Sequence, residues 1–263
     1  MIFLLAFCLK KKNYLIMINN RFHRLVILIL ILLNIPMLIF ALSFSEADRT
    51  ISELTQTWIN SKISNSLTLA KLRSLDQEIS ENLSGFDEYY LLAKSNLLKG
   101  TIKFSTDKQS DSIPFLEESS GQALKAVAIS KDSSDAWRIA AEAGSMIMIQ
   151  KGIPFIIANA RRIQGYIDTS LLLNSYNSRT AVLNAQKYIN APRIFGGDVS
   201  KGIEIIENAL IQTILPEDRF FALYTLVQAY DKKKDINSAL ENVNRVLEIF
   251  PDNPSIIELI DDL

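Results

Sequence analysis

Apolar residues recur three and four positions apart along nearly all of the chain after residue 43, which is the spacing of one face of an α-helix. The alternation of apolar and polar residues that is typical of a strand is almost absent, and glycine and proline lie mainly between the periodic runs. The pattern predicts helices at Glu46–Ser61, Ser64–Asn82, Phe86–Phe104, Ile113–Ile129, Ser134–Gln150, Pro154–Leu172, Ser178–Ile189, Lys201–Ile211, Glu217–Lys232, Ile236–Ile249 and Pro254–Asp262.

Helices that follow one another through short polar turns pack as antiparallel hairpins, and hairpins in series stack into a solenoid. The predicted fold is therefore all-α, a helix-hairpin solenoid or α-α superhelix. We expect an N-terminal helical region with degenerate hairpins over residues 44–130 and clearer repeats over residues 131–263.

One hairpin near the end of the chain, residues 220–253, carries a repeat signature. Its apolar, aromatic, small and terminating positions are Leu223, Leu226, Val227, Tyr230, Ala239, Val243 and Pro251. A small residue lets two helices approach closely, and proline cannot continue a helix. The unit resembles the tetratricopeptide repeat (TPR) family, although the Trp and Gly positions of that motif hold Leu223 and Val227. An ordinary amphipathic helix hairpin is the alternative.

The same repeat pattern occurs twice more towards the N-terminus. Ala181-Val182 and Ala136-Trp137 take the place of Ala222-Leu223 at the start of a first helix, at spacings of 41 and 45 residues. Because a TPR has about 34 residues, we expect the excess in loops or lengthened helices. The clearest insertion is 190–198, where Pro192 ends a helix, two glycines turn the chain and either Asp198 or Ser200 can cap the next helix.

The segment 181–210, which includes this insertion, is similar to divergent TPR proteins of bacterial envelopes. The likeness extends, more weakly, to the TPR component that accompanies some TRAP-type solute importers. These resemblances imply an exported member of the TPR family that binds a protein partner, with a small solute or a transporter subunit as the other candidates.

The first 43 residues have the composition of a targeting segment, since they contain no Asp or Glu and carry five Lys and Arg. Arg21 and Arg24 precede an uncharged run from Leu25 to Leu42, and small residues follow it, which is the order of a signal peptide. The run is also near the length of a membrane anchor, so an uncleaved N-terminal anchor helix stays open. Both interpretations place the body on the exported side, periplasmic or anchored to the cell membrane. Either Met1 or Met17 is the start.

Charge and residue content narrow the function classes. Without its first 43 residues the chain has 23 basic and 29 acidic residues and no basic stripe, which argues against nucleic-acid binding. We expect membrane contact only through the N-terminal segment. The body contains neither His nor Cys, which excludes Ser-His-Asp and Cys-His catalysis and any His/Cys zinc site. We predict no catalytic residue, cofactor or metal, although paired carboxylates need no local motif and leave an envelope hydrolase open.

In a stack of this kind the first helices of successive repeats line the inner curve. Each first helix carries the position that holds Trp in the TPR motif, which is Trp137, Val182 or Leu223 here. The residue directly after this position, and the residue four places further along the helix, should point to the inner curve. The predicted binding residues are Arg138, Glu142, Lys187, Tyr224 and Gln228. A solvated helix surface is the alternative for each of them. The predicted function is a non-catalytic, exported TPR scaffold for protein–protein interaction in the bacterial envelope. The alternatives are a periplasmic ligand-binding accessory of a TRAP-type importer and a carboxylate-dependent envelope hydrolase.

The targeting segment gives a direct prediction. Intact-mass analysis of the protein purified from the envelope should show a new N-terminus near Phe44 or Asp48, because the positive flank, the apolar run and the small residues occur in the order of a cleavable signal. Full-length chain recovered from the membrane fraction would establish the anchor instead, and protein found only in the cytoplasm would contradict both.

Overall fold

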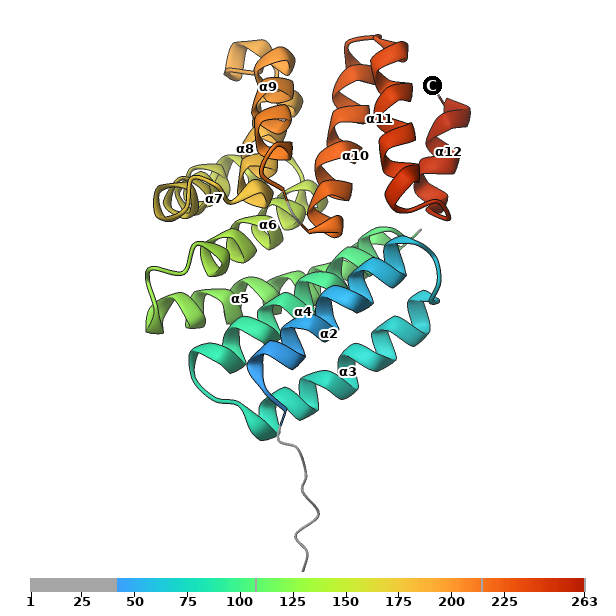
Figure 1. Cartoon of the computed structure of the whole chain (residues 1–263). Helices are drawn as coiled ribbons and strands as arrows, with labels where there is room; N and C mark the ends of the chain where they lie inside the picture. The colour runs from blue at the N-terminus through green and yellow to red at the C-terminus, as the bar shows by residue number, and fades with distance from the viewer. Residues whose placement is uncertain (1–41, 107, 214, 263) are drawn as a thin grey trace, which may run out of the picture. The chain divides into compact units, whose positions relative to one another are not determined.

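The computed structural model describes residues 42–106, 108–213 and 215–262. The predicted signal or anchor segment lies outside these residues apart from Leu42 and Ser43. All regular elements of the described part are helical, and it contains no strand, which confirms the all-α prediction (Figure 1). By their contacts, the residues from Leu42 to Leu263 form one compact unit.

Most consecutive helices pack against each other in pairs, as helix hairpins. In chain order they are α2 (Phe44–Ile59), α3 (Asn65–Asn82), α4 (Phe86–Phe104), α5 (Ile113–Ile129), α6 (Ser134–Lys151), α7 (Ile153–Leu173), α8 (Ser178–Asn190), α9 (Val199–Leu210), α10 (Pro216–Lys232), α11 (Ile236–Ile249) and α12 (Pro254–Asp262). Short 3-10 turns at Gln109–Ser112 and Arg193–Phe195 lie between α4 and α5 and between α8 and α9. The predicted helices match these within about two residues, which is the usual uncertainty of helix ends.

Side-chain caps explain why most of these helices begin where they do. The residue before the helix accepts a hydrogen bond from a backbone N–H of the first turn, which that turn cannot satisfy within the helix. The capping residues are Ser43, Ser64, Ser133, Asn177, Asp198 and Asp235. Asp198 is therefore the one of the two predicted caps after the insertion at 190–198 that the structure uses.

Small residues hold the two helices of each hairpin close together. A Cβ placed on Gly100 of α4 would lie 2.5 Å from a side-chain atom of Leu116 in α5, and one on Gly144 of α6 would lie 2.3 Å from Ile163 in α7. In the last hairpin Ala239 of α11 is completely buried, at the small-residue position of the repeat signature. Helix pairs that touch at Gly or Ala can bury more apolar surface along the rest of their length.

The apolar side chains form two large clusters and one small one. The first cluster contains side chains from all the helices between α2 and α6, and the second contains side chains from all the helices between α8 and α12. A small cluster of Ala141, Ile163, Ile167 and Leu183 connects α6, α7 and α8 between them. The predicted boundary at residue 130 falls between α5 and α6, which pack against each other within one unit.

The first hairpin also meets the last one. Ile59, at the end of α2, is buried in the second cluster with residues of α10 and α11. Asn60 accepts a hydrogen bond from the backbone N–H of Asp252 at 2.9 Å, and Asn253 donates its side-chain N–H to the carbonyl of Ile59 at 2.6 Å. Gln56 of α2 donates to Glu217 of α10 at 2.8 Å. We call these three hydrogen bonds the closure contacts.

The repeat signature at 220–253 has the packing that its residues predicted. Leu223, Leu226 and Val227 are completely buried, and Val243 is nearly so. Tyr230 is only partly buried, at the edge of the second cluster. The landmark positions of the hairpin therefore form its core, with the tyrosine at its margin.

The close contact at Ala239 can be tested by overpacking. Because Ala239 has no exposed surface, Ala239→Leu should lower the free energy of unfolding by about 1–3 kcal/mol. Thermal melts measure the change, and Ala70→Leu on the exposed surface of α3 is the control, with an expected change within about 0.5 kcal/mol. Equal stability of the two variants would show that the two helices do not touch at residue 239.

Candidate functional site

A large pocket of about 800 Å³ lies where the first helices of the hairpins face one another. Three of these helices each contribute a stripe with helical spacing. The stripes are Glu142, Ser145, Met146 and Ile149 on α6; Arg179, Val182, Leu183 and Gln186 on α8; and Phe221, Tyr224, Thr225 and Gln228 on α10. The spacing i, i+3, i+4, i+7 places each set on one face of its helix. The pocket is thus the inner surface shared by successive repeats.

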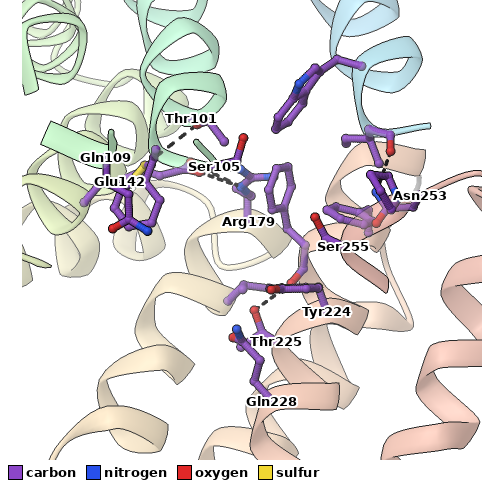
Figure 2. A pocket seen from close by; sticks show the side chains of 18 of the residues that line it. Thr101, Ser105, Gln109, Glu142, Arg179, Tyr224, Thr225, Gln228, Asn253 and Ser255 are labelled. Atoms are coloured by element: carbon purple, nitrogen blue, oxygen red, sulfur yellow. Dashed lines mark hydrogen bonds and ion pairs between the residues drawn. The ribbon is translucent and has the colours of Figure 1, made fainter. Parts of the chain in front are cut away.

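Residues near the start and the end of the described part of the chain complete the wall of the pocket. Trp58 and Ile59 come from the end of α2, and Asn253, Pro254 and Ser255 come from the turn before α12. Figure 2 shows Glu142 and Arg179 on one side of the pocket and Asn253 and Ser255 on the other, with Tyr224 between them. The closure contacts therefore add a further wall to the inner curve, and the pocket stays partly open.

Aromatic side chains form much of one wall. The ring of Tyr224 stacks on that of Phe220 with centroids 5.8 Å apart, and Phe220 meets Phe250 edge to face at 5.7 Å. Trp58 also lines the pocket, and its indole N–H donates to Asn65 at 2.8 Å, which fixes the orientation of its ring. Burial raises the pKa of Tyr224, while its hydrogen bond with Gln228 acts in the opposite direction, so the phenol stays protonated at neutral pH.

A buried ion-pair network forms the floor of the pocket between α6 and α8. The Glu142 carboxylate accepts a hydrogen bond from Arg138 at 2.9 Å and others from Arg179 at 3.2 and 3.3 Å. The guanidinium of Arg179 also lies 3.4 Å from the ring centroid of Phe221 and 3.7 Å from Asp218 of α10. Burial alone would raise the pKa of Glu142, but the two guanidinium groups outweigh it and hold the pKa below its ordinary value.

A second, smaller pocket of about 200 Å³ lies on the other side of this network. Arg179 lines both pockets, whereas Arg138 lines only the smaller one, together with Lys94 and Asp218. Burial raises the pKa of Asp218, although Arg179 and Arg138 partly oppose the shift. The charged groups of the network therefore contact one another more than they face the large pocket.

The structure brings together three of the five predicted binding residues. Glu142, Tyr224 and Gln228 line the large pocket. Arg138 is buried beneath it and paired with Asp135 and Glu142, so its guanidinium is not displayed on the inner surface. Lys187 lines neither pocket, because the stripe of α8 passes through Gln186 and the next residue on a helix points about 100° away.

Sequence reasoning missed Arg179, Trp58 and Asn253. Arg179 lies one turn before the expected landmark of α8, and only the i, i+3, i+4, i+7 stripe that it begins could have identified it. Trp58 and Asn253 lie at opposite ends of the described chain, so no local pattern connects them.

Glu142, one of the acidic residues that line the large pocket, gives little support to a role as general acid. It is held by two guanidinium groups with a lowered pKa, which makes it a poor proton donor. Within the described ranges no three His, Cys, Asp or Glu side chains are placed to hold a metal ion together. In the same ranges no helix has both the length and the apolar content that a membrane crossing requires.

Comparison with known proteins supports the repeat fold. The crystal structure of a thermophilic TPR protein in Thermus thermophilus matches with a TM-score of 0.54, covering 75% of this chain and 89% of that one at 14% sequence identity. At this identity the likeness shows the fold alone, which is TPR-like. No family model matches the sequence, and no curated protein matches it significantly.

The ion-pair network predicts a specific acid response. A carboxylate with a lowered folded-state pKa stabilises the fold above its ordinary pKa of about 4.3, and this stability is lost as the pH falls through the lowered value. Glu142→Gln should therefore lower the unfolding free energy at neutral pH by about 3 kcal/mol, because two buried guanidinium groups each lose one of their two carboxylate partners.

Urea unfolding at a series of pH values measures both effects. The Glu142→Gln variant should show a shallower loss of stability on acidification than the wild type, while Asp218, with its raised pKa, contributes the opposite trend in both proteins. Glu248→Gln, on the exposed face of α11, is the matched control. Parallel acid curves for Glu142→Gln and the wild type would show that folding does not lower the pKa of Glu142.

Proposed function

We propose that this chain is a non-catalytic, exported TPR-like scaffold that binds a segment of a partner protein in the large pocket. The observation that carries the proposal is the pocket itself, in which α6, α8 and α10 each present one stripe and residues near the ends of the described chain form a further wall. Inner surfaces of helical repeats are the usual binding faces of such folds.

The chemistry of the lining suits a polypeptide segment. Side-chain amides of Gln186 and Gln228 offer both donors and acceptors, which match the N–H and C=O groups of a peptide backbone. Trp58 and Tyr224 offer aromatic faces for apolar side chains. The charges of Glu142 and Arg179 are neutralised within the network, so we expect an uncharged segment and a weak dependence of binding on salt.

A second candidate function is a ligand-binding accessory of a solute importer of the TRAP type. The size of the pocket favours it, because about 800 Å³ lies within the usual range of small-molecule sites and the closure contacts form a wall on one side. Export of the chain is a part of both proposals, and it rests on the order of charged, apolar and small residues in the first 43 positions.

Site-specific photocrosslinking in cells distinguishes these functions. A photoreactive amino acid at position 228 lies in the pocket on an exposed side chain, whereas one at position 187 lies on α8 outside both pockets. We expect position 228 to yield a crosslinked protein band and position 187 to yield none. A small mass increase without a second protein at 228 would favour the solute-binding candidate.

Once a partner is purified, Tyr224→Ala should weaken its binding by about 2 kcal/mol, or about 30-fold, because a partly buried aromatic anchor is lost. Lys187→Glu is the control and should leave the affinity unchanged. Crosslinks of equal strength at 187 and 228, together with an unchanged affinity of Tyr224→Ala, would move the binding site out of the pocket.

A further inference from the structure

The first half of α7 carries apolar side chains that nothing in the described chain covers. Ile153 is 71% exposed and Ile157 is 79% exposed, and Ile156 next to them is also exposed. We call these three isoleucines the α7 patch. Single exposed apolar residues are common on protein surfaces, but three branched aliphatic residues on the first turns of one helix are typical of an interaction surface.

The patch exists because α7 is longer than the helix that covers it. The buried residues of α7 are Ile163, Ile167 and Ser170, all in its second half, where the small cluster joins it to α8. α7 has 21 residues and α8 only 13, so roughly two turns of α7 extend beyond its neighbour. Ile153, Ile156 and Ile157 lie at three- and four-residue spacing on these turns, which gives them one apolar face.

The charges around the patch are all positive along the chain. Lys151 precedes it and Arg161 and Arg162 follow it, while no Asp or Glu occurs between residues 149 and 167. Lys151 is paired with Glu117 of α5 and lies 5.0 Å from the ring centroid of Phe155. Within the described part of the chain, no ion pair involves Arg161 or Arg162. The sequence around the patch is therefore basic, whereas the net charge of the body as a whole is negative.

We propose that the α7 patch docks on the surface of an anionic lipid bilayer, with the first two turns of α7 among the headgroups. An apolar helix face flanked by Lys and Arg is the combination that such a surface attracts, because the side chains enter the acyl boundary while the cations meet lipid phosphates. The contact lies in the folded body, so it differs from the expectation that only the N-terminal segment touches a membrane.

The test uses the full chain with Cys8→Ser, because Cys8 is the only cysteine. An environment-sensitive fluorophore is attached after Ile157→Cys or, as the control, after Leu172→Cys. Leu172 lies on the same helix, is 86% exposed, and is about 22 Å away along the helix axis. Each protein is mixed with vesicles of phosphatidylcholine alone or of phosphatidylcholine with phosphatidylglycerol, both containing a lipid-borne quencher.

We expect quenching and a blue shift at position 157 several times larger than at 172, only with phosphatidylglycerol. Added salt or the double substitution Arg161→Gln, Arg162→Gln should reduce the signal, because both weaken the attraction between the cations and the lipid phosphates. Equal signals at the two positions, or equal signals with both lipids, would overturn the proposal. A blue shift at 157 that rises with protein concentration in the absence of vesicles would also overturn it, by assigning the patch to a second copy of the chain.

Discussion

The carboxylate of Glu142 lies between two guanidinium groups, and the arrangement of the inner helices depends on this contact. Arg138 belongs to the same helix as Glu142, whereas Arg179 belongs to the next hairpin and also approaches Asp218 of the one after. Three consecutive first helices are therefore joined by charge in a region where water cannot compensate a lost partner. Apolar packing brings α6, α8 and α10 together, but it would tolerate several registers, and the ion pairs are compatible with only one.

That register decides what the pocket displays. Because Arg179 reaches down to Glu142 with its guanidinium over Phe221, the face of α8 that remains for the pocket consists of Val182, Leu183 and Gln186. The inner surface consequently combines aromatic rings with amides and hydroxyls, although charged residues begin its stripes on α6 and α8. A binding surface of this kind selects by shape and hydrogen bonding more than by charge.

The helices were predictable from the sequence because their determinants are local. The periodicity of three and four, the capping residues such as Ser64 and Asp235, and the small contact at Ala239 each act within a few turns. The site was only partly predictable. Tyr224 and Gln228 follow from the spacing of the best repeat. On α8, however, the face that lines the pocket begins at Arg179, which pairs with Glu142 of the preceding hairpin, and this face leaves Lys187 outside. No local rule signals that Trp58 would share a wall with Asn253.

The closure contacts join residues that are 161, 192 and 194 positions apart, and this changes what kind of repeat array the molecule is. An open solenoid can gain or lose a repeat, because each unit contacts only its neighbours. Here the distance from Asn60 to Asp252 is fixed by the hairpins between them, so an inserted or deleted hairpin would separate the two ends. The number of repeats is thus a geometric constant of this fold, and the length variation that such arrays tolerate is confined to loops such as 190–198.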